Sequence, residues 1–203
     1  AGPRGQIGGT VTDSNSGEAI PFATVSIGLL STKTDADGNY LITMPVGETE
    51  ISAGKYGWVT SDATPISVLE DQTINTNISL DTAAAVMVSG SVKDGAGTDN
   101  PLYAKISVAV PGDTLTTFSN PETGAYSIQL YAGTTVNLTA SEIVVGGYLD
   151  SQQDLLPTTE DASNGLSDVN FDLATNSNCS APGYDFILPS FFEGFDSFPA
   201  SGW

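Results

Sequence analysis

Apolar and polar residues alternate along most of this chain with a period of two, and helical periodicity is almost absent. Threonine, valine, isoleucine and tyrosine fill the alternating runs, as a pleated, half-buried surface favours. Clusters of Gly, Pro, Asp and Asn separate the runs, which is typical of turns. The pattern therefore predicts an all-β fold of antiparallel sandwiches. The expected strands cover residues 7–13, 23–30, 39–44 and 48–53 in the first half, and 86–94, 103–110, 125–132 and 135–145 in the second.

The two halves also resemble each other. GTVTD at 9–13 is matched by GSVKD at 90–94, and GNY at 38–40 is matched by GAY at 124–126. Matched segments in the same order indicate a tandem duplication of a unit of roughly 80 residues. We expect one sandwich over residues 1–81, a second and divergent copy over 82–174, and a linker with an aromatic extended strand over 175–203.

Composition narrows the function classes. The chain has 203 residues, with 5 Lys+Arg against 24 Asp+Glu and a formal net charge of −19. A nucleic-acid interface needs a basic surface to neutralise phosphates, so we expect no nucleic-acid partner. No run approaches the roughly 20 apolar residues of a membrane-spanning helix, so we expect no membrane span.

The reactive side chains are few. The chain has no His and one Cys, Cys179, which excludes Ser-His-Asp and Cys-His catalysis and a Cys-based zinc site within one chain. Carboxylate chemistry stays open, but no pair of carboxylates is marked by the sequence, so we expect no enzyme and no cofactor other than calcium. Cys179 lies in the linker, where it is free, bridges to a residue outside this sequence, or forms an intermolecular disulfide with another subunit. Its place beside the incomplete third domain favours a partner outside this sequence.

Two further groups of residues are candidate sites. Asp35, Asp37 and Asn39 offer oxygen ligands at alternate positions, as in half of a calcium loop, but Val46 stands where such a loop has its bidentate Glu. A plain hairpin turn uses the same residues, and we favour it over calcium. Tyr56, Trp58 and Tyr148 lie near expected strand ends and could stack on sugar rings, although plugging one end of a sandwich is the interpretation we favour.

The first half contains a series of strand and turn motifs, at residues 9–13, 21–27, 34–40, 45–47 and 56–58. Together these motifs resemble the carboxypeptidase regulatory-like domain. That resemblance implies a transthyretin-like or prealbumin-like sandwich, non-catalytic, appended to secreted or surface proteins that are often peptidases or adhesins. The second half is a weaker match, because it lacks the Thr-Asp of the hairpin turn. In the second half the resemblance is carried by residues 90–94, 124–126, Gly133 and 147–148.

The last thirteen residues are rich in aromatic side chains, which are an aggregation hazard unless something covers them. They resemble the opening strand of a cleaved-adhesin or jelly-roll anchor domain, which implies an incomplete third domain. We expect the segment to pair with a neighbouring domain or subunit. The residues expected at that interface are Phe191, Phe192, Phe195, Phe198 and Trp203.

Three functions follow as alternatives. The first is a non-catalytic structural or interaction module, secreted or on the cell surface, that forms a processed or truncated part of a secreted peptidase or adhesin. The second is a self-assembling extracellular fibre subunit, a homopolymer whose C-terminal strand adds to the next subunit. The third is a carbohydrate-binding module.

Overall fold

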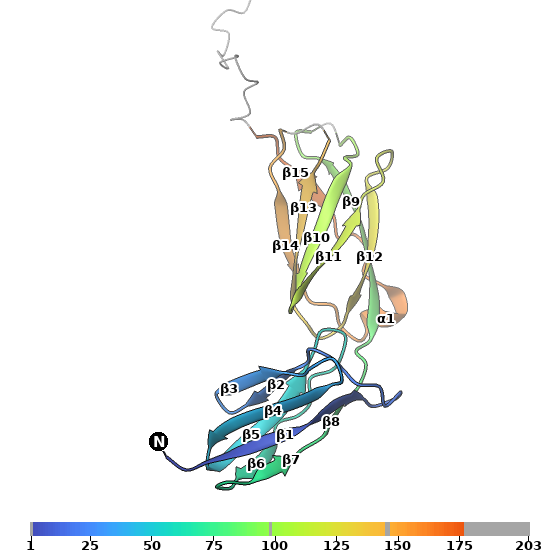
Figure 1. The fold of residues 1–203 in the computed structure, drawn as a ribbon. Helices are drawn as coiled ribbons and strands as arrows, with labels where there is room; N and C mark the ends of the chain where they lie inside the picture. The colour runs from blue at the N-terminus through green and yellow to red at the C-terminus, as the bar shows by residue number, and fades with distance from the viewer. Residues whose placement is uncertain (1, 98, 145–146, 177–203) are drawn as a thin grey trace, which may run out of the picture.

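The computed structural model describes residues 2–97, 99–144 and 147–176. The all-β expectation is confirmed, because fifteen strands and one four-residue helix account for the regular structure of these residues. The strands form two bodies stacked end to end, joined near residue 84 (Figure 1). The expected C-terminal extended strand lies outside the described residues.

The first body consists of two facing sheets. One sheet has the order β4-β1-β7, with β8 also paired to β1, and the other has the order β3-β2-β5-β6. Most neighbours are antiparallel, but β7 and β8 both run parallel to β1. The strands are β1 (Arg4–Asp13), β2 (Thr24–Ile27), β3 (Leu30–Lys33), β4 (Asn39–Pro45), β5 (Gly47–Gly54), β6 (Thr64–Val68), β7 (Thr73–Asn75) and β8 (Ile78–Leu80).

The second body has the same strand order. Its sheets are β12-β9-β15 and β11-β10-β13-β14, and β15 runs parallel to β9 as β8 does to β1. In place of β7 it has an isolated parallel bridge between Leu166 and Val88, preceded by the short helix α1. The elements are β9 (Ala85–Asp94), β10 (Ala104–Val110), β11 (Asp113–Phe118), β12 (Ala125–Tyr131), β13 (Val136–Glu142), β14 (Ser151–Leu155), α1 (Asp161–Asn164) and β15 (Phe171–Leu173).

One expected strand is divided. The run at 23–30 is a hairpin, because Gly28 adopts a φ of 54° and the chain reverses between β2 and β3. Periodicity alone misses this reversal, because the apolar alternation continues through Gly28 into the turn.

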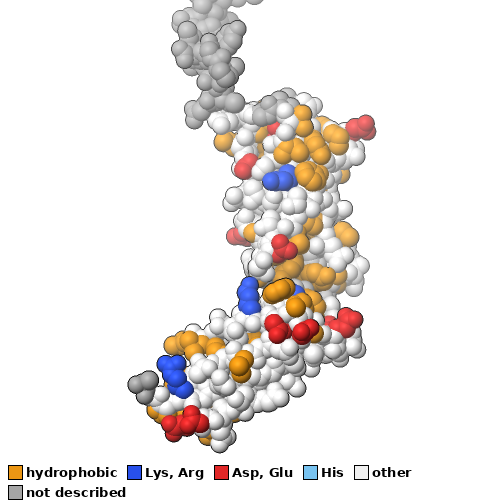
Figure 2. Space-filling view, in the orientation of Figure 1, with side chains coloured by type: hydrophobic (Ala, Val, Ile, Leu, Met, Phe, Trp, Pro, Cys, Tyr) orange, Lys and Arg blue, Asp and Glu red, His pale blue; other side chains and the backbone are white. Residues whose placement is uncertain are grey.

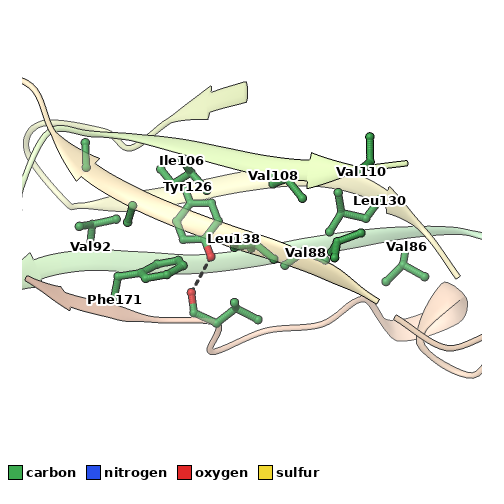
Figure 3. Packing of buried hydrophobic residues seen from close by; sticks show 14 of the residues in the cluster. Val86, Val88, Val92, Ile106, Val108, Val110, Tyr126, Leu130, Leu138 and Phe171 are labelled. Atoms are coloured by element: carbon green, nitrogen blue, oxygen red, sulfur yellow. Dashed lines mark hydrogen bonds between the residues drawn. The ribbon is translucent and has the colours of Figure 1, made fainter. Parts of the chain in front are cut away.

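Each body has its own core. Ile7, Val25 and Ile51 are fully buried in the first, and Val88, Ile106 and Leu138 in the second. Figure 3 shows the second core, where side chains from the two sheets meet between the layers. Alternate residues of each strand point inward, and burying this face provides most of the stabilisation of a sandwich.

A tyrosine closes each core in the same way. The Tyr40 hydroxyl donates a hydrogen bond to the Thr76 carbonyl oxygen at 2.5 Å, and the Tyr126 hydroxyl donates one to the Val169 carbonyl oxygen at 2.6 Å (Figure 3). Each tyrosine is paired across the sheet with a glycine, Gly9 on β1 or Gly90 on β9. The backbone segment that carries the acceptor carbonyl passes close to this glycine. A Cβ on Gly9 or Gly90 would lie about 2 Å from those same carbonyl oxygens of Thr76 and Val169.

Candidate functional site: the junction between the two sandwiches

The connector between the sandwiches is held on both sides by backbone hydrogen bonds. On the first sandwich, Val59 N–H donates to the Asp81 carbonyl at 2.8 Å, and Ala83 N–H donates to the Gly57 carbonyl at 2.9 Å. On the second, the N–H of Ala132 donates to the Ala84 carbonyl at 2.9 Å. Consecutive anchored residues leave the connector few free torsions, so it differs from a flexible linker.

Tyr56 makes the main side-chain contact across the junction. Its ring packs edge-on against the ring of Tyr131, with centroids 5.5 Å apart and an interplanar angle of 81°. Its hydroxyl oxygen accepts a hydrogen bond from the Tyr131 backbone N–H at 3.2 Å. Burial at this contact raises the pKa of Tyr56 above its ordinary value. Aromatic pairs in this geometry contribute about 0.5–1.5 kcal/mol beyond the area they bury.

Asp13, at the end of β1, ties three segments of the junction together. One carboxylate oxygen accepts hydrogen bonds from the backbone N–H groups of Asn15 and Ser16, both at 2.9 Å. The other accepts from the Trp58 indole at 2.9 Å and the Thr82 hydroxyl at 3.0 Å. The hydrogen bond from Ser16 and that from Trp58 are the main reasons why the pKa of Asp13 lies far below its ordinary value.

Trp58 is held within this network. Lys55 places its ammonium nitrogen 5.2 Å from the centroid of the indole and donates to the Pro21 carbonyl oxygen at 2.8 Å. The rest of the indole packs against the first core. Because one face of the ring meets a cation and the ring is half-buried, Trp58 is less open to sugar stacking than the sequence suggests.

A groove of about 720 Å³ lies beside this network, between the outer face of β2, β3 and β5 and the turn that joins β10 to β11. Its floor is made of small polar residues, among them Thr24, Ser26 and Ser52. Lys33 pairs with Thr24 across the sheet and also lines the groove, with no ion pair among the described residues. Phe22 lies at the rim, 64% exposed and with a φ of 58°, which is uncommon for a bulky residue.

The three aromatic residues predicted to stack on sugars do not share one surface. Tyr56 and Trp58 both line the groove. Tyr148 lies at the opposite end of the second sandwich, where it forms an isolated bridge with Thr175 and packs against its own core. Any sugar-binding surface at the junction would therefore consist of Tyr56, Trp58 and the exposed Phe22.

The structure gives Asp35 a turn-capping role. Its carboxylate accepts hydrogen bonds from the backbone N–H groups of Asp37 at 3.0 Å and Asn39 at 2.8 Å, and these bonds lower its pKa. In the second sandwich, the neutral amide oxygen of Asn120 accepts two backbone bonds within its turn, from the N–H groups of Glu122 and Thr123. An amide in the same role favours the hairpin interpretation. In the described part of the chain, no three His, Cys, Asp or Glu residues are grouped so as to hold a metal.

The remaining predicted site residues fall beyond Asn176. Cys179 and the aromatic residues Phe191, Phe192, Phe195, Phe198 and Trp203 lie outside the described residues, and their roles stay predictions.

Sequence reasoning missed several junction residues. Asp13 was visible only as part of a family motif, and nothing in the pattern connected it to Trp58. Tyr131 ends β12 like any strand residue, so its contact with Tyr56 has no sequence signal. Phe22 could have been noticed as a large apolar residue in a turn, next to Pro21.

Comparison with known proteins supports part of the resemblance. Residues 6–81 match the family model of the carboxypeptidase regulatory-like domain, which confirms the family resemblance of the first sandwich. A search of curated proteins gives no match. No helix in the described residues is both long enough and apolar enough to cross a membrane.

Solved structures similar to this chain include the TIE protein of Bacillus anthracis, at 13% identity and a TM-score of 0.39, covering 85% of this chain and 34% of that one. A streptococcal ancillary pilin matches at 12% identity and a TM-score of 0.44, covering 85% of this chain and 62% of that one. The shaft pilin SpaA of Lactobacillus rhamnosus GG matches at 10% identity and a TM-score of 0.40, covering 86% of this chain and 98% of that one. This chain thus spans less than two thirds of the first two, and we draw no functional argument from these scores.

Proposed function

We propose that this chain is a non-catalytic structural module of a secreted or surface protein, in which two copies of the regulatory-like sandwich form a rigid spacer. The single observation that carries this proposal is the anchored junction. The connector is bonded to both sandwiches, and Tyr56 contacts Tyr131 with both its ring and its hydroxyl oxygen. A spacer that transmits position needs such a junction, because a flexible linker would let each unit reorient independently.

The repeated construction supports treating the second sandwich as a second copy of the matched domain. The strand order is the same in both bodies, and the same tyrosine and glycine positions close both cores. Buried hydroxyls also correspond. Thr34 accepts a hydrogen bond from the Ala23 N–H, and Ser119 accepts one from the Ala104 N–H, each at 2.8 Å.

Attachment to a secreted peptidase or adhesin is the part of this proposal that rests on the family match alone. The strongly acidic composition supports it only in a general way, since net charge keeps an exported chain soluble. We propose no catalytic activity and no bound cofactor for the module, and calcium binding stays a prediction.

Small-angle X-ray scattering tests the spacer directly. We expect the 203-residue chain to scatter as an elongated body whose two sandwiches keep one relative position. Tyr56→Ala should broaden the distribution of inter-sandwich distances, because it removes the ring contact and the hydrogen-bond acceptor together. Leu41→Ala, at an exposed position on β4, is the matched control and should leave the profile unchanged. A parent profile that already requires freely reorienting sandwiches would contradict the proposal.

A second candidate function is carbohydrate binding at the groove. The observations that favour it are the floor of hydroxyl side chains, the exposed Phe22 ring and the Lys33 ammonium group, which suit a saccharide carrying carboxylates. A glycan array should then show binding that Phe22→Ala and Lys33→Ala each weaken. Absence of binding to every acidic glycan would remove this candidate.

The fibre-subunit alternative depends on residues 191–203 and stays a prediction. Deleting residues 190–203 should abolish polymerisation if that segment adds to a neighbouring sheet. If no polymer forms from the undeleted chain at any concentration, this alternative is lost.

A further inference from the structure

At one end of the first sandwich, a loop holds the chain segment that leads into the second sandwich. The loop between β5 and β6 holds the departing chain with two backbone hydrogen bonds, between Val59 and Asp81 and between Ala83 and Gly57. One residue later, Ala84 is already bonded to the second sandwich. This arrangement therefore fixes the direction in which the chain leaves β8.

The far end of the second sandwich repeats this arrangement. Leu149 N–H donates to the Ala174 carbonyl at 2.8 Å, and Asn176 N–H donates to the Gly147 carbonyl at 2.7 Å. The isolated bridges correspond as well, with Tyr148 and Thr175 in the second sandwich standing for Trp58 and Thr82 in the first. These contacts lie beyond the sheet, because β15 ends at Leu173 and residues 174–176 follow it. We therefore interpret this end as a second exit of the same kind.

Apolar side chains are exposed around this exit. Phe118, Ile143, Val144 and Leu149 are 49%, 46%, 68% and 49% exposed, and the Tyr103 ring lies 6.0 Å from that of Phe118. Figure 2 shows hydrophobic side chains gathered at this end of the upper body, beside a cationic one. We call these five residues the distal patch. A group of exposed apolar residues of this kind often marks a surface that another chain segment or protein covers.

The distal patch is not a copy of the Tyr56 contact. The residue before Gly147 is Gly146, where the first sandwich has Tyr56 before Gly57. The backbone arrangement is thus repeated, while the apolar contact surface is provided by the side chains of the patch.

We propose that the distal patch is the docking face for the chain that follows Asn176, and that residues 177–203 cover it. The last described residue, Asn176, is bonded to Gly147, two residues before Leu149 of the patch, so the chain that follows starts beside the patch. Their composition fits, because they contain five of the eight phenylalanines of the chain. They also contain three acidic residues and no Lys or Arg, and Lys105 lies opposite Phe118 across the sheet at the edge of the patch. The inference adds a third docked segment to the proposed spacer. It rests on the proposed function only in one respect, because it treats the junction at Ala84 as a model for how a following segment docks.

Hydrogen exchange on the 203-residue chain tests this docking. We expect backbone amides of residues 184–203 to exchange at least about tenfold more slowly than in a free synthetic peptide of the same sequence. Ile143→Ser combined with Leu149→Ser should return them to the rate of the free peptide, and Phe118→Ser should do so in part. The control is Leu30→Ser with Leu41→Ser, exposed leucines on the first sandwich, which should change nothing.

Two results would overturn the proposal. The first is exchange at the free-peptide rate in the parent chain, or protection that survives the patch substitutions. The second is protection that grows with protein concentration, which would assign the patch to the segment of a second copy. Neither result depends on the junction near Ala84, whose rigidity is measured separately by scattering, so docking and spacer can fail independently.

Discussion

The hydroxyl oxygen of Tyr56 accepts a hydrogen bond from the backbone N–H of Tyr131, which lies 75 residues further along the chain and in the other sandwich. This contact connects the loop after β5 to the end of β12. Both residues also stack edge-on, so the junction has a side-chain contact in addition to its bonded connector. The predictions below test the parts of the molecule on which this arrangement depends.

Because backbone atoms lie very close to Gly9 and Gly90, we expect a Gly→Ala substitution at either position to reduce stability strongly. A Cβ on Gly90 would lie 1.9 Å from the Val169 carbonyl oxygen, and one on Gly9 would lie 2.0 Å from that of Thr76. Gly90→Ala and Gly9→Ala should each lower the free energy of unfolding of their own sandwich by at least about 3 kcal/mol. Gly2→Ala, with no atom within 4 Å of its added Cβ, is the control. Chemical denaturation would measure the loss, and tolerance of Gly90→Ala would contradict the described crossing of β9.

The buried tyrosines predict alkaline destabilisation. Burial raises the pKa of Tyr40 to about 12 and also raises that of Tyr126 above its ordinary value. The unfolded chain loses these protons near pH 10, so between about pH 10 and 12 it binds fewer protons than the folded state. The free energy of unfolding should therefore fall as pH rises through this window. In the Tyr40→Phe, Tyr126→Phe double variant the fall should be smaller, and an unchanged slope would argue against the burial of both hydroxyls.

The same hydroxyls predict a loss of stability at neutral pH. Tyr126→Phe removes the donor to the Val169 carbonyl and leaves that acceptor without its partner. We expect the unfolding free energy of the second sandwich to drop by about 1–2 kcal/mol. Tyr103→Phe, in an aromatic pair at the distal patch, is a matched control in which we expect a smaller change. Urea titration of both variants would separate the two cases.

Asp13 predicts an acid dependence with the opposite sign. Hydrogen bonds, above all those from Ser16 and Trp58, hold the pKa of Asp13 below its value of 3.8 in the unfolded chain. The stability that Asp13 contributes is therefore fully present above about pH 4 and is lost as pH falls through the lower pKa of the folded state. Asp13→Asn should weaken the first sandwich at neutral pH and flatten the acid part of the curve. Asp62→Asn, at an exposed position between β5 and β6, serves as the charge-matched control. Equal curves for the two variants would refute the role of Asp13.

The sequence predicted most of the fold because burial in a sandwich follows a period of two. The period-two positions Tyr40, Ile42 and Met44, and likewise Tyr126, Ile128 and Leu130, were expected in the core. Ile42 and Ile128 are partly buried, and the other four are buried. The reversal at Gly28 was missed because alternation continues through the turn. The contact between Tyr56 and Tyr131 was unpredictable for another reason. Residues at the ends of two folded units meet only once both units are placed, and no local pattern encodes that placement.

The central claim is that the two sandwiches form one rigid body. The most direct test is to measure residual dipolar couplings of backbone amides in the 203-residue chain, fitting residues 4–80 and 85–173 separately. The account predicts one alignment tensor, with the same magnitude and orientation for both ranges. Two tensors that differ in magnitude or orientation would show that the sandwiches move independently or sit differently, and would contradict the claim.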